Sequence, residues 1–333
     1  MLNQQKPFVS FVIPCYNCID KVYKLLNSLE KQTDRDFEAI FVDDCSVDDT
    51  FTKLIEYSKQ SGLNMKVVKN EVNSGPGITR NTGIELVSGE YVTFVDSDDY
   101  ISEKSVEVWH KILTSDGNID CLAFDYYIVN GEDEKSQRIY LGNLETSDRI
   151  IELDCKKSIV YIAGATWCKV YRTDMIVNNG VKFLNLMRNE DMPFTKCALK
   201  YAKKTVYLRE PLYYYVMQSG SLTHNDSLRN SNNTVVGFDA VEKCLRDTHY
   251  AECEAIFAIE LYTMVQNMIS EKAKRKDIIR RICDGEKRFP TIWKNRYISE
   301  YPKKYKIAFF LLRNKLVFGL RAVYRIAKLG RKI

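Results

Sequence analysis

A short apolar run followed at once by three acids occupies the segment Gly89-Glu-Tyr-Val-Thr-Phe-Val-Asp-Ser-Asp-Asp99. Residues 91–95 are rich in β-branched and aromatic side chains, which is typical of a buried strand. The acids follow directly, where such a strand would end. Because ligands of open α/β sheets bind beyond the carboxyl ends of the strands, the segment predicts both a strand and a binding site next to it.

Strand and helix patterns alternate through the rest of the first hundred residues. Buried strands are predicted over residues 8–13, 37–42, 65–69 and 91–95. Helices are predicted between them, over residues 20–32, from Ser46 onward and over residues 78–87. This alternation indicates an α/β fold, with a mostly parallel sheet, right-handed crossovers and flanking helices.

Polar and acidic residues follow three of these strands. They form the segments Cys15-Tyr16-Asn17, Asp43-Asp44 and Asp96-Ser97-Asp98-Asp99. Asp is a common turn residue, which is the competing explanation for the Asp43-Asp44 pair. Three acids within four positions repel one another unless a cation is present. Carboxylate oxygens suit Mg²⁺ or Mn²⁺, so we expect a metal ion that in turn holds a diphosphate.

Five motifs together resemble the family 2 glycosyltransferases in order and spacing. They are Val9-Ser-Phe-Val-Ile-Pro-Cys-Tyr-Asn17, Phe41-Val-Asp-Asp-Cys-Ser46, Asn73-Ser-Gly75, Thr79-Arg-Asn-Thr-Gly83 and the 89–99 segment. The likeness is close over about the first hundred residues and continues more weakly to about His224. It implies a GT-A fold and an inverting, metal-dependent transfer of one sugar from a nucleotide diphosphate donor, of the bacterial cell-surface polysaccharide type.

The resemblance also implies roles for residues of the donor site. Pro14 and Tyr16 would contact the nucleotide, with Tyr16 beside the base. Asp44 would accept a hydrogen bond from the base edge, which suits the N–H of a uracil and therefore a UDP-sugar. Arg80 would reach the donor phosphates with its forked guanidinium.

The metal site implied by the resemblance centres on the acidic run. Asp98 would bind the Mn²⁺ or Mg²⁺ ion, Asp96 would approach the ribose or the metal, and Ser97 would contact the donor. His224 is a further candidate ligand, although Gln218 lies closer to the usual family position. Cys15-x-x-Cys18 offers half of a zinc site or a redox pair, but no second Cys or His pair follows to complete four ligands.

Two positions depart from the family pattern. Cys45 stands where the family usually has Gly, and Pro76 lies in a loop that is normally rich in glycine. Neither change removes a functional side chain, so we expect both to affect loop shape rather than chemistry.

The catalytic base is expected at Asp191, because Glu190-Asp191 resembles the Glu-Asp pair of the family. One carboxylate within reach of the acceptor hydroxyl suffices for this reaction. The competing interpretation is that Asp191 caps the helix that contains Pro193 in its first turn. Glu190, Trp167 and Lys169 are the predicted acceptor-binding residues, with core packing as the alternative for Trp167.

The chain is predicted to contain three parts. Residues 1–224 form the catalytic domain, with a nucleotide-binding half (1–100) and an acceptor half (101–224). Residues 225–302 form a helical extension, and residues 303–333 a basic amphipathic tail. This tail holds ten Lys/Arg and no Asp or Glu, so residues 1–302 carry a net charge of −5.

The tail is expected to bind an anionic membrane surface. Its predicted apolar face contains Phe309, Leu312, Leu316 and Leu320, continued by Val323 and Ala327. The alternative is a helix packed on the protein with a solvated basic face. No signal peptide or membrane-spanning segment is recognised and the ten cysteines are scattered, so we expect a cytoplasmic enzyme attached to the inner face of the cell membrane.

The alternatives to a glycosyltransferase are less well supported. A nucleotidyltransferase should have a glycine-rich, Arg-containing loop after the first strand, and residues 14–17 are not that loop. A non-catalytic nucleic-acid-binding protein would rest on the tail alone. A processive synthase would carry a Gln-x-x-Arg-Trp motif, which is absent. The expected partners are a nucleotide-sugar donor and a lipid-linked or cell-surface glycan acceptor.

Overall fold

The computed structural model describes residues 6–130, 136–142, 144, 147–217 and 229–330. The chain forms two compact units. The first contains residues 1–142 and 148–224, and the second contains residues 143–147 and 225–333.

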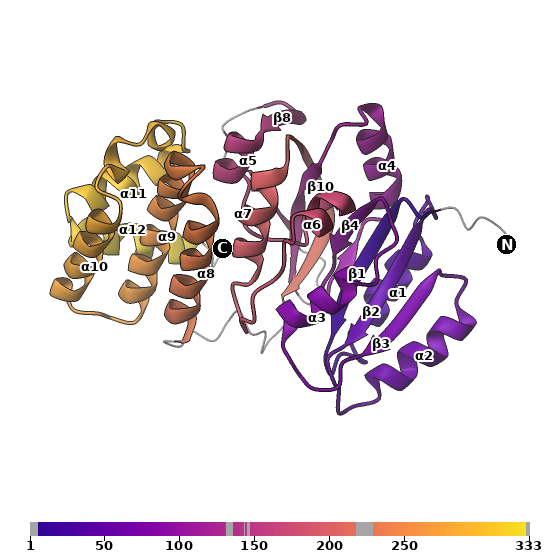
Figure 1. The fold of residues 1–333 in the computed structure, drawn as a ribbon. Helices are drawn as coiled ribbons and strands as arrows, with labels where there is room; N and C mark the ends of the chain where they lie inside the picture. The colour runs from indigo at the N-terminus through magenta and orange to yellow at the C-terminus, as the bar shows by residue number, and fades with distance from the viewer. Residues whose placement is uncertain (1–5, 131–135, 143, 145–146, 218–228, 331–333) are drawn as a thin grey trace. The chain divides into compact units, whose positions relative to one another are not determined.

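A single mixed sheet with flanking helices makes up the first unit (Figure 1). Its strands are β1 (Val9–Cys15), β2 (Phe37–Asp43), β3 (Met65–Lys69), β4 (Tyr91–Phe94), β5 (Tyr100–Ile101), β6 (Cys121–Asn130), β7 (Ser136–Ile139), β8 (Ile150–Asp154), β9 (Lys169–Arg172) and β10 (Lys204–Met217). Its helices are α1 (Tyr23–Glu30), α2 (Thr50–Gln60), α3 (Pro76–Ile84), α4 (Ser105–Ser115), α5 (Cys155–Tyr161), α6 (Thr173–Asn178) and α7 (Asp191–Tyr201).

The four strands predicted in the first hundred residues are confirmed. They pair in the order β3-β2-β1-β4, and every pair among them is parallel. The connections from β1 to β2 and from β2 to β3 move along the sheet in one direction, and the connection from β3 to β4 moves back in the other. Because such crossovers are right-handed, α1 and α2 cover one face of the sheet and α3 covers the other (Figure 1).

The centre of the sheet is apolar on both faces. Phe11, Val12 and Ile13 of β1 are completely buried, and each such side chain contributes roughly 1.5–3 kcal/mol through burial. Trp109 of α4 covers one face, with its ring 5.8 Å from that of Phe11 and 5.4 Å from that of Phe124. Strands buried on both faces lack a polar alternation, which is why the sequence shows continuous apolar runs.

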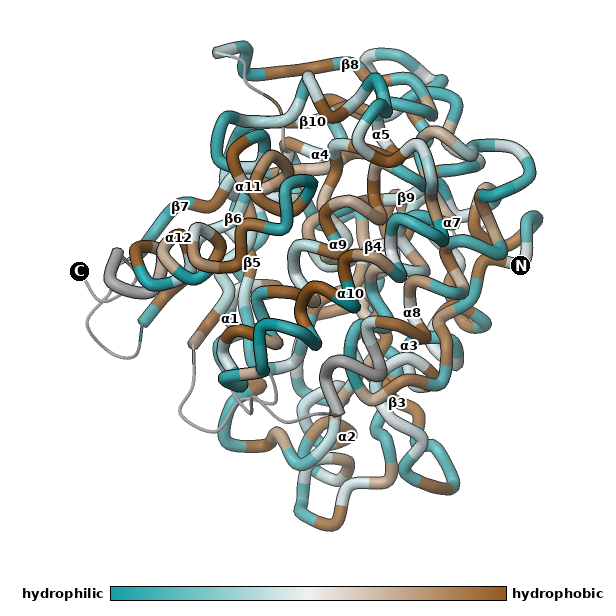
Figure 2. Tube along the Cα trace, turned by 90° about the vertical axis from the view of Figure 1, so that its left-hand side faces the viewer, coloured by the Kyte–Doolittle hydropathy of each residue, from teal (hydrophilic) through white to brown (hydrophobic). Residues whose placement is uncertain are grey.

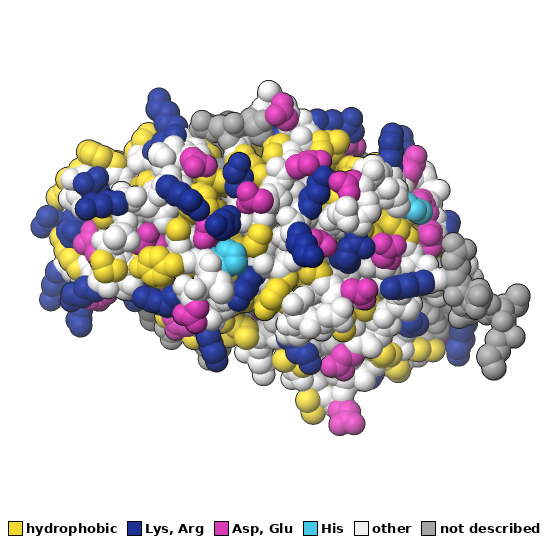
Figure 3. All heavy atoms as spheres, turned by 45° about the horizontal axis from the view of Figure 1, so that its top comes forward, with side chains coloured by type: hydrophobic (Ala, Val, Ile, Leu, Met, Phe, Trp, Pro, Cys, Tyr) yellow, Lys and Arg dark blue, Asp and Glu magenta, His cyan; other side chains and the backbone are white. Residues whose placement is uncertain are grey.

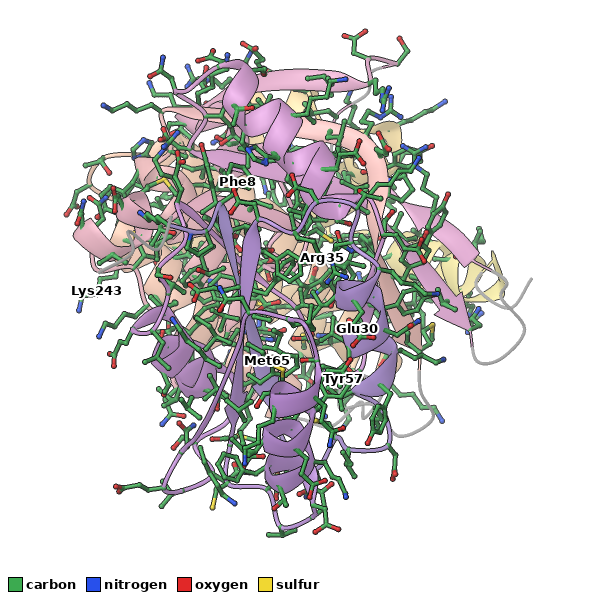
Figure 4. All side chains as sticks on the ribbon, turned by 90° about the vertical axis from the view of Figure 1, so that its right-hand side faces the viewer. Phe8, Glu30, Arg35, Tyr57, Met65 and Lys243 are labelled. Atoms are coloured by element: carbon green, nitrogen blue, oxygen red, sulfur yellow. The ribbon has the colours of Figure 1, made fainter. Side chains whose placement is uncertain are left out.

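Helices α1 and α2 meet beside the edge strand. Glu30, the last residue of α1, lies next to Tyr57 of α2, and Met65 at the start of β3 lies close by (Figure 4). Burial and a hydrogen bond to Glu30 raise the pKa of the Tyr57 hydroxyl above its ordinary value. Arg35 donates to the backbone oxygen of Glu30, so the end of α1 is held from both sides.

The two predicted halves of the first unit are not separate layers. Strand β9 lies between β4 and β6, and β10 pairs with both β6 and β5. Strands β6 and β7 pair antiparallel. The boundary expected at residue 100 therefore falls within one continuous sheet.

Helices alone make up the described part of the second unit. They are α8 (Arg229–Leu245), α9 (Tyr250–Ser270), α10 (Arg275–Arg288), η2 (Ile292–Lys294), η3 (Arg296–Ser299), α11 (Lys303–Arg313) and α12 (Val317–Gly330). The core contains Phe238, Phe257 and Phe289, whose rings lie 4.9–6.1 Å apart.

The tail differs from the single amphipathic helix that we expected. It forms two helices, because the chain turns at Lys315 with a φ of +54°. The predicted membrane face is partly used inside the unit, since Phe309, Leu312 and Leu320 are buried. Hydrophobic and hydrophilic residues alternate along α12 in Figure 2. Within the described ranges, no helix combines the length and apolar character that crossing a bilayer requires.

Candidate active site

Three loops meet at the carboxyl edge of the parallel strands, as the sequence predicted. Cys15 at the end of β1 is in register with Asp43 at the end of β2. The backbone N–H of Asp44 donates to the carbonyl of Cys15 over 2.7 Å, and Val95 donates to Val12 over 3.2 Å. The segments that begin at residues 14, 43 and 96 are therefore neighbours in space.

Two hydrogen bonds of Asn17 connect the first two loops. Its backbone N–H donates to Ser46 Oγ over 3.0 Å, and its side-chain Oδ1 accepts from the N–H of Val47 over 3.0 Å. Pro14 is partly buried, whereas Tyr16 is 48% exposed and presents its ring to solvent. This geometry leaves the Tyr16 ring accessible to a base.

Cys45 shows why the family prefers glycine at this position. Its φ is +59°, in the left-handed region that glycine adopts without steric cost. Pro76 is the first residue of α3, where the missing N–H costs nothing, and it follows Gly75 with a φ of +84°. Both departures from the family pattern are thus accommodated by the backbone, in agreement with the expectation that they affect loop shape.

Asp44 organises the loop between β3 and α3. Its Oδ2 accepts from the N–H of Gly75 at 2.7 Å, and its Oδ1 accepts from the N–H of Ser74 at 3.0 Å and from Asn70 Nδ2 at 2.9 Å. The residue is only 4% exposed. A carboxylate can accept about four hydrogen bonds, and Asp44 already accepts three. The predicted contact with a base edge is not tested by this geometry.

Arg80, in the middle of α3, is the centre of the site. Its Nη2 lies 2.7 Å from Asp96 Oδ1, its Nη1 lies 2.7 Å from Glu190 Oε1, and Nη1 is 3.6 Å from Asp191 Oδ1. Burial disfavours the charged form of the guanidinium and acts to lower its pKa. The nearby carboxylates of Asp96, Asp191 and Glu190 have the larger effect, so the pKa of Arg80 lies above its ordinary value. Arg80 remains a cation that joins the end of β4 to the start of α7.

The predicted contacts of Arg80 with donor phosphates and of Glu190 with an acceptor remain predictions. Arg80 is 3% exposed, and its two terminal nitrogens donate to carboxylates. Glu190 is 7% exposed and accepts from Arg80 Nη1. Both residues hold the site together from within.

Two glycines permit this close approach. A Cβ on Gly77 would lie 2.5 Å from the carbonyl oxygen of Leu184, so α3 packs directly on the segment that leads to Glu190. A Cβ on Gly164 would lie 2.8 Å from Met192 Cβ, which lets the start of α7 approach the loop before Trp167. Small residues at these positions bring Arg80 and Asp191 into one cluster.

Asp191 is the first residue of α7, with Glu190 as the N-cap. Its Oδ2 accepts from the backbone N–H of Thr166 over 3.3 Å rather than from an N–H of its own helix, so the capping alternative is wrong. Its Oδ1 is buried and, among the described residues, has no hydrogen-bond donor. Burial raises the pKa of Asp191 to about 7, Arg80 opposes that rise, and Glu190 and Asp96 add to it.

The acidic run after β4 divides into residues with different environments. Asp99 is 1% exposed, and its carboxylate accepts from Tyr213 Oη at 2.6 Å and from the N–H of Val216 at 2.8 Å. Asp99 therefore anchors β10. Asp98 is partly exposed, and burial followed by the charge of Asp96 raises the pKa of its carboxyl.

The remaining acids fit a divalent cation. Asp96 and Asp98 offer carboxylate oxygens, the donor type that Mg²⁺ and Mn²⁺ prefer, and a cation would relieve the repulsion that raises the pKa of Asp98. Asp96 keeps one oxygen beyond the one bound by Arg80, and its side chain is 28% exposed. No group of three or more potential ligands is found in the described part of the chain. His224 and Gln218 lie outside the described residues.

Trp167 belongs to an aromatic cluster. Its ring stacks on Tyr213 at 4.6 Å and on Tyr215 at 5.7 Å, and the ring of Tyr126 meets it edge-on at 4.7 Å. The packing interpretation is therefore confirmed; the tryptophan is also partly exposed, and its contact with an acceptor remains a prediction.

Lys169, another of the predicted acceptor-binding residues, is completely buried in β9, and its Nζ donates to the carbonyl of Ala165. Burial lowers the pKa of this amine to about 8. Lys169 therefore supports the loop before Trp167, and its contact with an acceptor remains a prediction.

Several residues of the site were not recognised in the sequence. Thr166 positions Asp191 through its N–H, and Tyr213 joins the acidic run by donating to Asp99 and accepting from the N–H of Asp96 at 3.2 Å. The small-residue stretch 163–165 and the three consecutive tyrosines 213–215 were the available signals, but only the fold shows what they contact.

The two cysteines of the first loop are free and buried. A hydrogen bond between the two thiols lowers the pKa of Cys18, and burial raises the pKa of Cys15. Ser97 also lies within hydrogen-bond reach of Cys18, so it packs against this loop. Neither thiol belongs to a group of three or more potential metal ligands among the described residues.

Comparison with known proteins gives consistent matches. The model of the family described as "Glycosyl transferase family 2" matches residues 10–176. The chain is 34% identical over 210 residues to the poly(ribitol-phosphate) beta-N-acetylglucosaminyltransferase TarS of Staphylococcus aureus (strain MW2), covering 62% of this chain and 35% of TarS. It is 28% identical over 297 residues to the poly(ribitol-phosphate) beta-glucosyltransferase of Bacillus spizizenii, covering 88% of this chain and 44% of the relative.

A solved structure covers nearly the whole chain. The crystal structure of S. aureus TarS 1–349 in complex with UDP superposes with a TM-score of 0.67 and 25% identity, over 97% of this chain and 92% of that one. The chain spans less than half the length of both curated relatives.

Proposed function

Since its family model covers residues 10–176, the chain belongs to glycosyl transferase family 2, and we propose that it moves a single sugar from a UDP-sugar onto a hydroxyl of a glycan acceptor. The observation that carries the proposal is the Arg80 cluster. It brings Asp191, a carboxylate with a pKa of about 7, to the same sheet edge as the nucleotide-binding motifs.

Asp191 is the proposed general base. A base acts best when its pKa is near the working pH, and burial moves Asp191 from the acid range to about 7. Its Oδ1 has no donor among the described residues, so it can accept the proton of an incoming acceptor hydroxyl. Attack from that side inverts the anomeric configuration. Thr166 fixes the other oxygen, which orients the carboxylate.

Tyr16, Pro14 and Asp44 are the proposed nucleotide-binding residues. Tyr16 offers an exposed ring for stacking, and Asp44 sets the loop that precedes α3. Among the relatives, TarS has been crystallised with UDP, which supports a uridine donor. Ser97, beside the first loop, completes this group.

Asp96 and Asp98 are the residues that would hold Mg²⁺ or Mn²⁺. Such an ion neutralises charge on a leaving diphosphate. The protein's own contribution is to keep Asp96 oriented through Arg80 and Tyr213 and to keep Asp98 at the rim of the site.

The acceptor class is inferred from the relatives. Two of them are named as enzymes that transfer N-acetylglucosamine or glucose to poly(ribitol-phosphate). We therefore propose a cell-surface or lipid-linked glycan as the acceptor, with Trp167 at its pocket. A location in the cytoplasm, peripheral to the inner face of the cell membrane, is part of the same proposal.

The test is a donor and acceptor screen by nucleotide release. UDP-N-acetylglucosamine, UDP-glucose and GDP-mannose are each incubated with the full chain and Mn²⁺, with and without poly(ribitol-phosphate). We expect one UDP-sugar to be consumed faster when acceptor is present, and the Asp191→Asn variant to lose that increment. Failure of every UDP-sugar, or consumption of GDP-mannose alone, contradicts the proposal.

A further inference from the structure

We propose that the outward side of α11 and α12 binds the surface of an anionic lipid membrane. We call this side the outer face and define it by four apolar residues, Ile307, Phe310, Phe318 and Ile326, with the cations Lys306 and Arg325. The inference goes beyond sugar transfer and rests on the peripheral membrane location proposed above, for which it names the residues; they differ from those of the apolar face that the sequence pattern suggested.

The outer face is the side of each helix opposite to its packing side. Helix α11 buries Phe309 and Leu312, and α12 buries Val317 and Leu320. These inward residues already complete the core of the unit. The outward apolar residues are therefore not required for folding.

The outward residues recur at helical spacing. Ile307 and Phe310 are three positions apart on α11, and Phe318 and Ile326 are eight apart on α12, so each pair shares one stripe of its helix. Their exposures are 46%, 62%, 77% and 69%. Single exposed apolar residues are normal, but these two phenylalanines and two isoleucines lie on two helices that pack against each other, and clustered exposed apolar residues mark interaction sites.

Charge indicates what covers this patch. Lys306 and Arg325 have no ion pair with any other described residue, whereas Lys315 pairs with Glu286 at 2.9 Å and Arg321 donates to the carbonyl of Ala273. Residues 303–333 contain ten cations and no acid, and residues 225–333 contain 23 Lys/Arg against 12 Asp/Glu. Figure 3 shows Lys and Arg side chains interspersed with hydrophobic ones on the second unit, which contains α10–α12.

A lipid surface fits this combination better than a second copy of the chain. Pairing two outer faces would bring cations of the same sign together, which opposes association. Anionic headgroups attract Lys and Arg while phenylalanine and isoleucine enter the boundary with the acyl chains. The attraction falls off within about 10 Å at 0.1 M salt, but the apolar contribution persists. High salt should therefore release the protein only in part.

Vesicle co-sedimentation of the full chain tests the apolar half of the outer face. Vesicles of phosphatidylglycerol and phosphatidylcholine are compared with phosphatidylcholine alone. We expect binding to the anionic vesicles and at least about tenfold weaker binding when Phe310→Ser and Phe318→Ser are combined. The matched control combines Ile150→Ser with Val177→Ser, two residues of the first unit that are each 51% exposed, and should bind as the wild type does.

Charge reversal tests the other half. Lys306→Glu combined with Arg325→Glu should weaken binding to anionic vesicles by at least about tenfold at low salt. The control, Lys24→Glu with Lys111→Glu, changes the net charge equally at exposed positions of the first unit and should have little effect. Unchanged melting temperatures show that the variants remain folded.

The proposal is overturned if the full chain does not sediment with anionic vesicles, or if the outer-face variants bind like their controls. A dimer in solution that Phe310→Ser and Phe318→Ser convert to a monomer, without vesicle binding, would assign the face to a second copy instead. UDP-sugar consumption in free solution should be the same in all variants, so failure here is distinguishable from failure of the proposed activity.

Discussion

Arg80 Nη1 lies 2.7 Å from Glu190 Oε1, although the two residues are 110 positions apart in the chain. The second terminal nitrogen of the same guanidinium holds Asp96 at the same distance. The buried cation of Arg80 therefore holds Asp96, shortly after β4, close to Glu190 at the start of α7. The proposed metal site and the proposed base are positioned by this single side chain.

Replacing Arg80 tests this positioning role. Arg80→Lys keeps the charge but cannot reach both carboxylates with one ammonium group, so turnover should fall by about 10²-fold, the cost of a displacement near 1 Å. Arg80→Ala leaves buried acids unpaired and should lower the free energy of unfolding by about 3–5 kcal/mol. Arg149→Lys, at an exposed ion pair with Glu210, is the control and should change neither quantity. Full turnover in Arg80→Lys would refute the role; turnover and thermal unfolding are the measurements.

Asp191→Asn tests the general base. The amide is nearly the same size and can still accept from the N–H of Thr166, so UDP affinity measured by calorimetry should be kept. Turnover should fall by at least about 10²-fold. NMR of the product linkage should show inverted anomeric configuration. A retained configuration would contradict the mechanism whatever the variant does.

The activity should depend on pH through Asp191. Its pKa is raised to about 7, so the rate should rise as pH increases through about 7 and then level off. The effect on stability has the opposite sign. A raised folded-state pKa stabilises the protein at low pH, and this contribution is lost as pH rises through 7. The stability of Asp191→Asn relative to the wild type should therefore increase from pH 5 to pH 8, as measured by thermal unfolding. The same stability difference between variant and wild type at pH 5 and at pH 8 would be inconsistent with a raised pKa.

Asp98 and Asp99 are expected to have different roles, the first in binding the metal and the second in stabilising the fold. EDTA should abolish transfer, Mn²⁺ or Mg²⁺ should restore it, and Asp98→Ala should abolish transfer in a protein that melts normally. Asp99→Asn weakens two hydrogen bonds to β10 in a buried setting and should cost about 1–3 kcal/mol of stability. Full activity in chelator would disprove the metal requirement.

Asp44→Ala should weaken UDP binding by about 1–3 kcal/mol, because the N–H groups of Ser74 and Gly75 lose their acceptor and the donor loop loosens. Asn70→Ala removes one donor to Asp44 but leaves the carboxylate in place, so it should have the smaller effect. Calorimetry with UDP and GDP decides the base preference. Equal affinity of the wild type for the two nucleotides would rule out recognition of uracil by Asp44.

Local sequence patterns were sufficient for the nucleotide-binding edge. The strands of the first hundred residues are short apolar runs that end in polar residues, and the expected GT-A fold class is confirmed by the family match and the TarS structures. Asp44, Asp96 and Asp98 could be placed at one edge because parallel strands end on the same side. Asp191 was found through the motif it shares with the family.

The burial of Arg80, Glu190 and Lys169 could not be predicted in the same way. Each is a charged residue that sequence patterns assign to the surface, and each is buried because partners distant in the chain satisfy it. The break between α11 and α12 depends on one residue, Lys315, adopting a left-handed conformation that its type does not favour. Tertiary contacts decided these positions.

The order of strands in the sheet has a consequence for synthesis of the protein on the ribosome. Strand β4 pairs on one side with β1, which is made earlier, but on the other side with β9, whose first residue comes 75 positions after Phe94. At a synthesis rate of roughly 5–20 residues per second, this edge of β4 stays unpaired for several seconds until β9 has been made. An apolar edge exposed for that time is a site for aggregation, so the nascent chain should be a client of ribosome-associated chaperones until β9 emerges.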